Sequence, residues 1–367
     1  MRTLERGPQR ESLDAAIMSV ANTYGFVGQP HTITRNDLSD VPEEVDRDTA
    51  LITTLASKIG PVTQTTQAWA TSKKSGGTTV VFAAASQKLS IAQAFVVKAA
   101  LATAESAGFV DPIVLISSVG DQESRRRYVR ELGNFFKKFV KDLPEDVLAV
   151  SVKNPDEAVR MLLEQEHPLG ESVPRTIDFL SESSRKIMLE TISLFESLDI
   201  QYELDSRLPY TPELNRELIF AVEGYDRRGT RVRVATGGRF QEEKKKKDKT
   251  EVIGMSVSLD DQLDVRGLHD AYMPACFVVH VGEAAKLRAF TLLDSLWRAH
   301  IALGQALLAD TIQDQMENAK QSEAKYIAII GQREALDNTV ILKNVSTQLQ
   351  ETIPVEKLIA RMSRVRV

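Results

Sequence analysis

The strongest constraint on the fold of this chain is a pair of apolar runs near its end. The first run, KYIAIIG at residues 325–331, is rich in β-favouring residues and stops at a glycine. A polar turn follows, and a second run, TVILKN, begins at residue 339. A run of about six such residues bounded by glycine is typical of a strand buried on both faces. We therefore predict two strands in a sheet that helices cover.

Length and cysteine usage limit the class of protein. The chain has 367 residues, enough for two or three domains that each bury a core. Its one cysteine, Cys276, excludes a disulfide framework within the chain and any site with several cysteine ligands. That usage fits a reducing compartment, so we expect a cytoplasmic protein. The five histidines are scattered without helical metal-ligand spacing, so no metal site is expected.

The chain offers no sign of a membrane segment, and its charge is nearly balanced. Residues 1–8 lack an apolar core, so we expect no signal peptide. No stretch approaches the ~18 apolar residues of a membrane span. The net charge is −5, from 46 basic and 51 acidic residues. Because a dedicated nucleic-acid binder usually carries a basic domain or face, this balance mildly disfavours nucleic-acid binding.

The first two thirds of the chain read as strands flanked by helices. An amphipathic helix is predicted at 12–24, before Gly25. The other predicted elements of this part are strands at 78–85, 112–117, 201–204, 217–223, 230–235 and 251–259, helices at 90–107, 122–141 and 181–198, and a largely helical region at 154–198. Antiparallel strands flanked by helices indicate an α+β domain.

The pattern changes near residues 265–273. From Met273 onward strands and helices alternate, which indicates a small α/β domain with a mixed sheet. We therefore predict a first domain at residues 1–268, with a helical region at about 122–198, and a second domain at residues 272–367.

Six short runs form a family pattern when taken together. They are ISSVG at 116–120, FLSESSR at 179–185, LDIQYELDSRL at 198–208, GGRF at 237–240, and the two apolar runs near the end. In this order they resemble histidyl-tRNA synthetase, a class II aminoacyl-tRNA synthetase, from about residue 80 onward. The resemblance implies an antiparallel class II core with flanking helices, followed by a small anticodon-binding-like domain with a mixed sheet.

The chain departs from this family at the residues that carry its chemistry. Class II synthetases clamp the phosphates of ATP with one arginine from motif 2 and one from motif 3. The family's IGPVFR is IGPVTQ here, which places Gln64 at the first arginine, and Asp261 stands at the second. A neutral amide cannot replace a guanidinium fork, and a carboxylate repels phosphate. The resemblance therefore implies a degenerate paralogue that has lost its catalytic motifs.

The expected ligand pocket survives only in part. In a gapless alignment from Leu208, the family's catalytic arginine becomes Tyr210. The positions that we assign as pocket remnants are Gln64, Tyr210, Arg216, Gly237, Gly238 and Arg239. We interpret Arg239 as a structural turn residue and Arg216 as a solvated charge at a strand edge. No catalytic residue and no metal ligand is assigned.

Basic clusters offer a possible alternative contact for polyanions. The candidate residues are Arg125, Arg126, Arg130, Lys245 and Lys246. In the first cluster, Phe135, Phe136, Phe139 and Val140 recur at helical spacing and are expected in a core, with the lysines solvated. The second cluster, KKKK at 244–247, is typical of a solvated loop.

Acidic residues replace basic ones in the second predicted domain. Asp314 and Glu317 lie in a helix where the family has lysines. Because neutralised phosphates supply most of the sequence-independent affinity for nucleic acid, tRNA binding should be weak or absent.

These observations favour a non-catalytic, dimeric binding or regulatory protein. A protein partner is compatible with this interpretation, and no cofactor and no membrane association are expected. The apolar face of the 12–24 helix is expected to form the two-fold interface of a homodimer. One alternative is a regulatory subunit of ATP phosphoribosyltransferase, which acts in histidine biosynthesis and is also synthetase-like. A second alternative is a divergent but active histidine-tRNA ligase, which would use ATP and Mg²⁺.

Overall fold

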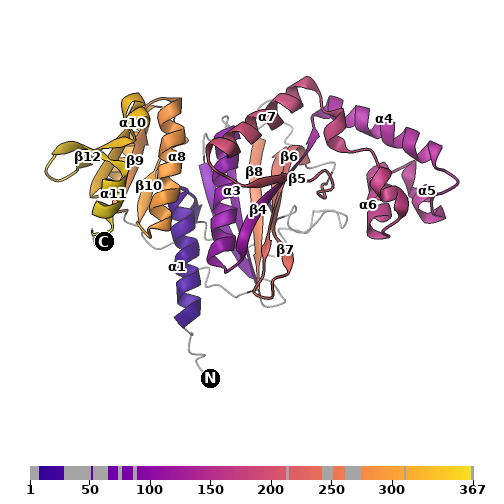
Figure 1. Ribbon diagram of the computed structural model, residues 1–367, viewed down its shortest axis with the longest axis horizontal. Helices are drawn as coiled ribbons and strands as arrows, with labels where there is room; N and C mark the ends of the chain where they lie inside the picture. The colour runs from indigo at the N-terminus through magenta and orange to yellow at the C-terminus, as the bar shows by residue number, and fades with distance from the viewer. Residues whose placement is uncertain are drawn as a thin grey trace.

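The computed structural model describes residues 8–28, 51–52, 65–72, 77–85, 89–211, 215–241, 251–260, 274–309 and 311–364. This part of the chain contains two β-sheets with helices packed against them (Figure 1). The larger sheet and a group of helices beside it come from the first two thirds of the chain. The smaller sheet comes from the last third, as the change of pattern near residue 273 predicts.

The larger sheet has eight described strands in the order β1-β2-β3-β8-β7-β6-β4-β5. They are β1 (Val27–Gly28), β2 (Thr65–Ser72), β3 (Thr78–Ala85), β4 (Val110–Gly120), β5 (Tyr202–Leu204), β6 (Asn215–Tyr225), β7 (Arg231–Gln241) and β8 (Glu251–Leu259). The pairs from β2 to β4 are antiparallel, and those at the two ends, β1 with β2 and β4 with β5, are parallel. The predicted α+β class with an antiparallel core is confirmed.

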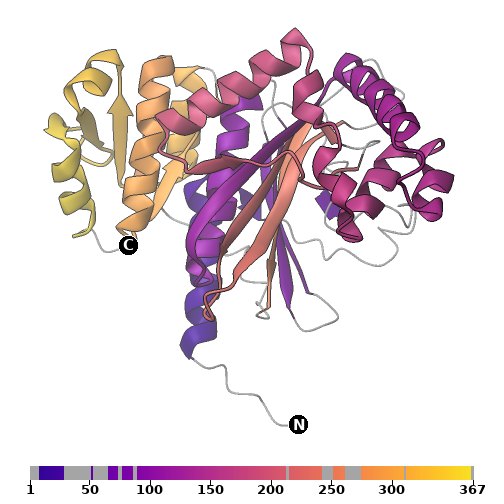
Figure 2. The ribbon, with the colours of Figure 1, turned by 45° about the vertical axis from the view of Figure 1, so that its right-hand side comes forward.

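Two helices, α3 (Leu89–Ser106) and α7 (Glu182–Ser197), cover one face of this sheet, and α1 (Pro8–Thr23) packs against α3 (Figure 2). Alternate strand residues such as Phe82, Phe220 and Met255 point to this side and join the main core with Phe95 of α3. The predicted helix at 181–198 is confirmed, and Ser181 caps it by accepting a hydrogen bond from the Ser184 amide.

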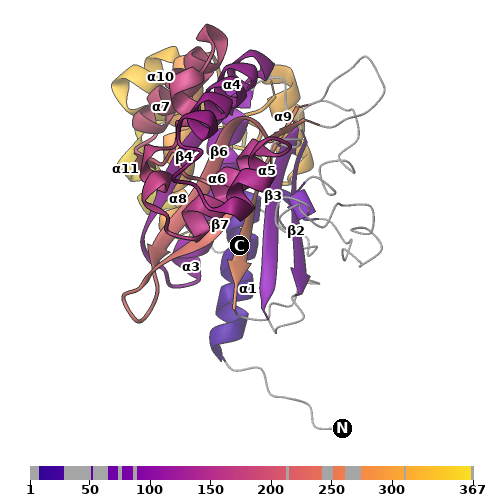
Figure 3. The same ribbon diagram turned by 90° about the vertical axis from the view of Figure 1, so that its right-hand side faces the viewer.

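A helical arm leaves the sheet after β4 and returns before α7 (Figure 3). Its elements are α4 (Gln122–Lys138), α5 (Glu145–Ser151), α6 (Pro155–Glu164) and the short 3-10 helices η2 (Pro168–Ser172) and η3 (Thr176–Phe179). The arm has its own core, in which Phe135 and Phe136 are buried as predicted. The prediction for Val140 is wrong: α4 ends at Lys138, three residues early, so Val140 leaves the helical period and is 50% exposed.

The smaller sheet is mixed, with the order β10-β9-β11-β12-β13. Its strands are β9 (Cys276–His280), β10 (Leu303–Gln305), β11 (Tyr326–Ile330), β12 (Thr339–Asn344) and β13 (Gln350–Pro354), and its helices are α8 (Glu283–Arg298), α9 (Ile312–Gln321), α10 (Gln332–Asp337) and α11 (Val355–Met362). The two apolar runs are β11 and β12, and they pair antiparallel, while β9 lies parallel to both β10 and β11. The predicted mixed sheet is confirmed.

Helix α1 lies between the two halves of the chain. Its apolar face is buried against α3 and α8, and the ring of Tyr24 lies 6.4 Å from that of Phe95 and 6.3 Å from that of Phe290. The expectation that this face forms a dimer interface is therefore wrong, because the same chain covers it. The main core runs from the larger sheet through α1 into the smaller sheet. The boundary between residues 268 and 272 falls outside the described residues and stays a prediction.

None of the helices in the described ranges is both long and apolar enough to cross a lipid bilayer.

Candidate functional site

The candidate site is the face of the larger sheet that points away from α3. Strand side chains alternate between the two faces, and Phe82, Ile253 and Met255 belong to the core under α3. Their neighbours in β3 and β8, such as Ala83 and Gly254, therefore point to the other face, and the two strands pair with Ala83 opposite Gly254. This second face is where the antiparallel sheet could hold a ligand.

An isoleucine occupies the part of this face over β8. A Cβ atom on Gly254 would lie only 2.4 Å from the Cγ2 atom of Ile52, so the glycine is needed for the approach of that side chain. Ile52 and the adjacent Leu51 are fully buried, with at most 1% of their surface exposed. The hydroxyl of Ser256, two residues along the same strand, is buried without a hydrogen-bond partner. An apolar side chain thus covers this half of the face.

The other half of the face, over β4 and β6, is covered by the segment that follows β5. Leu115 of β4 and Ile219 and Ala221 of β6 form a small cluster with Leu208, and the ring of Tyr210 packs against it. Tyr210, which the sequence alignment places at the family's catalytic arginine, therefore lies on this face, but its ring fills space there.

The hydroxyl of Tyr210 is held by two charged groups of the helical arm. It donates a hydrogen bond to Oδ1 of Asp156 at the start of α6, and Nη1 of Arg125 in α4 donates to it at 3.0 Å. Arg125 also forms a two-point ion pair with Asp156, with one bond at 2.8 Å and a second through Nη2. We call these three residues the Tyr210 network.

The Tyr210 network is strongly coupled. Burial, the Asp156 carboxylate and Tyr128 together raise the pKa of Tyr210 well above its usual value. Burial lowers the pKa of Arg125, but the hydrogen bond to Asp156 and the nearby charges of Tyr210, Asp156 and Tyr128 together outweigh it and raise the pKa. The guanidinium also lies 5.6 Å from the centre of the Tyr210 ring and 5.7 Å from that of Tyr128. A guanidinium paired in this way stays charged and already has its carboxylate partner.

The GGR run of β7 has structural partners. A Cβ atom on Gly238 would lie 2.5 Å from the carbonyl oxygen of Leu218, so close strand packing requires a glycine there. A Cβ atom on Gly237 would meet the carbonyl oxygen of Gly254 at 2.1 Å. Arg239 is buried in β7 and donates from Nε to Oε1 of Gln93 in α3 at 3.1 Å. The interpretation of Arg239 as a turn residue is therefore wrong, and its side chain points to the face that α3 covers.

Arg216 lies in β6, between β4 and β7 in the sheet. We interpret it from the sequence as a solvated charge at a strand edge, and it is the second residue of this strand; its side chain is half-buried, and its Nη1 donates to the carbonyl oxygen of Asn215 at 2.8 Å. As ligand contacts, Arg216, Gly237, Gly238 and Arg239 stay predictions.

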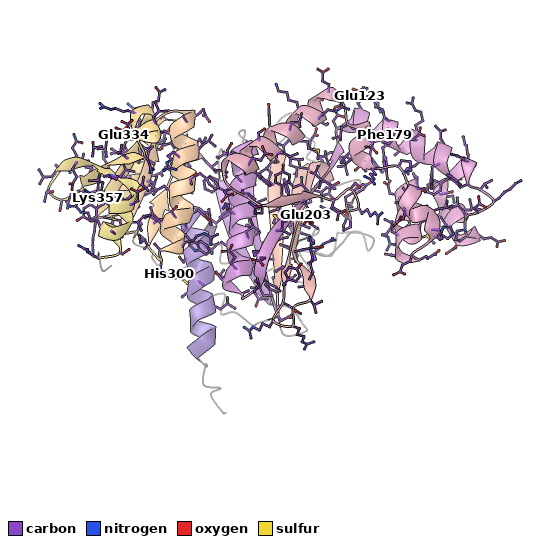
Figure 4. All side chains as sticks on the ribbon, viewed as in Figure 1. Glu123, Phe179, Glu203, His300, Glu334 and Lys357 are labelled. Carbon is purple, nitrogen blue, oxygen red and sulfur yellow. The ribbon has the colours of Figure 1, made fainter. Side chains whose placement is uncertain are left out.

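The predicted polyanion contacts do not form one surface, because some are exposed to solvent and one is turned inward. Arg126 and Arg130 are exposed on α4, whereas Arg125 is turned inward to Asp156. In Figure 4, Glu123 marks the start of this helix and Phe179 lies beneath it. Gln64, Lys245, Lys246 and Asp261 lie outside the described residues. Among the described candidates, the structure brings Tyr210 into contact with Arg125 and pairs Arg216 with Arg239 across β6 and β7, and these two pairs lie in different surroundings.

Sequence reasoning missed two partners that decide these placements, Asp156 and Gln93. Asp156 lies in the turn KNPD at 153–156, where Asn154 caps α6, and its contact with Tyr210 spans 54 positions. Gln93 lies in a mostly apolar helix, where a buried amide is a signal that it has a polar partner. Among the described residues, no three His, Cys, Asp or Glu side chains are grouped to hold a metal ion.

Comparison with known proteins finds a matching domain family and similar sequences. The anticodon binding domain family matches residues 275–364. The chain is 26% identical over 257 residues to histidine--tRNA ligase of Geobacillus sp. (strain WCH70), a match that covers 67% of this chain and 60% of the relative. It is 25% identical over 271 residues to the ligase of Bacillus subtilis (strain 168), covering 71% of this chain and 63% of the relative. The matches thus span less than two thirds of these relatives.

The fold is also found in a solved structure. The crystal structure of apo S. aureus histidyl-tRNA synthetase aligns with a TM-score of 0.52 at 19% identity, covering 99% of this chain and 100% of that one. At this level of identity the similarity shows a shared fold. Together with the anticodon binding domain and the ligase relatives, it shows that the chain is similar to histidyl-tRNA synthetases in both sequence and fold.

Proposed function

We propose that this protein is a synthetase-like binding or regulatory protein that does not activate an amino acid. The observation that carries the proposal is the covered sheet face, where Ile52 packs on Gly254 and the ring of Tyr210 packs over β4 and β6. Activation of an amino acid requires room for ATP and positive groups aimed at its phosphates. Apolar side chains take up the room on this face.

The charges near this face support the same proposal. The guanidinium of Arg125 is paired with Asp156, and that of Arg239 lies on the face that α3 covers. The sequence places Gln64 and Asp261 where the family has its two phosphate-clamping arginines. A paired arginine gives little stabilisation to a developing phosphate charge, because its own carboxylate competes.

A tRNA substrate is disfavoured by the surface of α9. Asp314 and Glu317 are both exposed on this helix. Asp314 also accepts a hydrogen bond from the Thr311 hydroxyl at 2.7 Å, which ties its charge to the helix start. The proposal therefore assigns this protein a partner or small ligand in place of tRNA. A homodimer remains part of the proposal by analogy with class II synthetases, through a surface other than the apolar face of α1.

The decisive experiment is ATP–pyrophosphate exchange with each amino acid, measured beside the Bacillus subtilis histidine--tRNA ligase as the positive control. We expect background exchange, because losing one electrostatic stabiliser typically costs ~10²–10³ in rate and this chain lacks both phosphate-clamping arginines of the family. Histidine-dependent exchange within about tenfold of the control would overturn the proposal.

A binding measurement separates a regulatory protein from one that has lost the pocket entirely. A thermal-shift series with histidine and with ATP reports binding without turnover, since a ligand at 100 times its dissociation constant adds about 2.7 kcal/mol of stability. Stabilisation by histidine without exchange would point to a histidine sensor. Light scattering on the same samples gives the oligomeric state, and a monomer mass at micromolar concentration would remove the homodimer from the proposal.

A further inference from the structure

The carboxyl ends of β9 and β10 form a switch point in the smaller sheet. The two strands are parallel neighbours, but the helices that follow them pack on opposite faces. Helix α8 joins the main core through Ala289 and Phe290, whereas α9 packs through Met316 and Ala319 on the other face. In open α/β sheets, ligands bind in the crevice beyond the strand ends at such a point. The chain therefore has a second place where a ligand could bind, away from the larger sheet.

Helix α8 starts at this switch point and is open to solvent there. It is 16 residues long, and its N-cap is Gly282, which adopts a φ of 91° and offers no side-chain acceptor to the first amides. Residues 281–284 are all exposed. The first amides of a helix and its dipole together favour a negative group at this end. In Figure 4, Glu334 marks this end of the smaller sheet, and His300 marks the opposite end of α8.

A buried histidine lies beneath the start of α8. His280 is the last residue of β9 and is only 6% exposed. Neither ring nitrogen has a hydrogen-bond partner of normal geometry, although backbone groups of Gly282 and Leu307 border the ring. Gln315 of α9 fixes the residue by accepting from its amide at 2.9 Å and donating to its carbonyl at 3.2 Å. An imidazole fixed in this way against the helix N-cap is available to respond to a charge placed there.

The charges around the imidazole favour its neutral form. Burial lowers the pKa of His280, and the positive charge of Lys286 lowers it further. Lys286 lies one turn into α8 and is 2% exposed. Among the described residues, the opposing charge is that of Glu283, also on α8, while α9 presents the neutral amide of Gln315. An added anion would offset the field of Lys286 at the ring.

We propose that the N-terminus of α8, above His280 and beside Lys286, binds the phosphate group of a small phosphorylated molecule. The helix amides and the charge of Lys286 supply the attraction, and the His280 ring adds to it when it is protonated. A nucleic acid is the less suitable occupant, because Glu283 and the exposed Asp314 at the start of α9 would repel a chain of phosphates. The site is independent of the larger sheet, so it stands whether or not the proposed function does.

Binding and protonation must be linked at this site. An anion that favours the imidazolium form of His280 is bound more tightly when that form is present, and the two effects are reciprocal. The affinity for an anion of constant charge should therefore rise as the pH falls. Sulfate is a suitable probe because it does not titrate between pH 5.5 and 8, whereas phosphate does.

The test is calorimetric titration of the full chain with sulfate at pH 5.5 and at pH 8.0, with chloride keeping the ionic strength constant. We expect the wild-type protein to bind sulfate several-fold more tightly at pH 5.5. His280→Gln should lose this pH dependence, because its amide carries no charge. The matched control His300→Asn changes an exposed histidine at the opposite end of α8 and should keep it.

A second pair of variants tests the place of binding without touching a buried residue. Glu283→Gln removes an exposed negative charge from the first turn of α8 and should tighten sulfate binding at both pH values. Glu317→Gln removes an exposed charge from α9 and should leave the affinity unchanged. Inorganic phosphate at pH 8.0 should show the same ranking of variants.

Three outcomes would overturn the proposal. The first is the absence of saturable binding at both pH values. The second is an equal effect of sulfate on the wild-type protein, His280→Gln and Glu283→Gln, which would mark a general salt effect. The third is tighter binding of a short single-stranded RNA than of phosphate, with that RNA binding lost in His280→Gln, which would assign the site to nucleic acid.

Discussion

Asp121 shows how much one side chain can determine at the scale of a residue. Its Oδ1 accepts from the amide and hydroxyl of Ser124 at 2.8 and 2.7 Å, which caps α4. Its Oδ2 accepts from the hydroxyls of Ser181 and Ser183 at 2.8 and 3.1 Å, at the start of α7. One carboxylate thus joins the N-termini of two helices that are 60 positions apart in the chain.

Asp121→Asn should weaken this junction. Burial alone would raise the pKa of Asp121, but the hydrogen bonds from Ser124, Ser181 and Ser183 lower it to about 2. Because this value lies below the model-compound value of 3.8, the stabilisation is full above about pH 5 and is lost as the pH falls toward 2. An amide cannot accept at both ends, so we expect a loss of about 1–2 kcal/mol in unfolding free energy at pH 7.

Urea denaturation at pH 7 and pH 3 tests this expectation. The difference between the wild-type protein and Asp121→Asn should shrink at pH 3, because the carboxyl of Asp121 is by then largely protonated in the unfolded chain and gains a proton on unfolding. Asp178→Asn, which changes an exposed carboxylate of η3, should be nearly neutral at both. A difference that did not change with pH would contradict the assigned pKa of Asp121.

The Tyr210 network acts at the scale of elements. It connects α4 through Arg125, α6 through Asp156, and the segment before β6 through Tyr210. Side chains on three elements share one set of hydrogen bonds, so the position of the helical arm on the sheet depends on them together. The aromatic core of the arm alone does not fix that position, because it lies within the arm.

Tyr210→Phe should cost about 1 kcal/mol, and Asp156→Asn about 2–3 kcal/mol, because the latter leaves the largely buried Arg125 without its charge partner. The double variant should lose less unfolding free energy than the sum of the two single losses, since both residues belong to one network. Chemical denaturation of the single and double variants measures this, and hydrogen exchange should show α6 opening more often.

Tyr202→Phe is the matched control: its hydroxyl donates at 3.0 Å to the exposed Glu196, so its loss should cost under about 0.5 kcal/mol. Strict additivity would contradict the network.

At the scale of the whole molecule, the two sheets share a core around α1. The hydroxyl of Tyr24 donates to Oδ1 of Asp294 at 3.0 Å, and Lys98 forms an ion pair with the same carboxylate at 3.5 Å. The rings of Phe95 and Phe290 lie 4.7 Å apart across the same junction. Residues of α1, α3 and α8 therefore stabilise one another, and the two sheets should not unfold separately.

The two tryptophans report on this coupling. Trp69 lies in β2 of the larger sheet and Trp297 in α8 beside the smaller one. In thermal unfolding, Trp69→Phe and Trp297→Phe variants should report the same midpoint by fluorescence. Phe290→Ala should lower both midpoints together, with a cost of about 3–5 kcal/mol for the buried cavity. Leu336→Ala, at a position that is 85% exposed, should leave both unchanged. Two separate midpoints would favour independent domains.

Much of the fold could be predicted from the sequence because it follows from local periodicity. The strand at 78–85 and the strand at 251–259 have the predicted bounds, and the two apolar runs near the end are β11 and β12. The candidate site was less predictable. The alignment located Tyr210 at the position of the family's catalytic arginine, but it could not show that Asp156 holds the tyrosine hydroxyl or that Ile52 packs on Gly254.

The sequence by itself determined the order of helices and strands, the class of each half, and the replacement of charged residues at family positions. These properties depend on side chains close together in the chain, where the period of apolar residues is visible. The tertiary structure decided which surfaces meet. Tyr24 bonds to Asp294 across 270 positions, so the face of α1 that suggested a dimer interface is covered by its own chain. Contacts at such separations depend on how whole elements pack, and no local pattern encodes them.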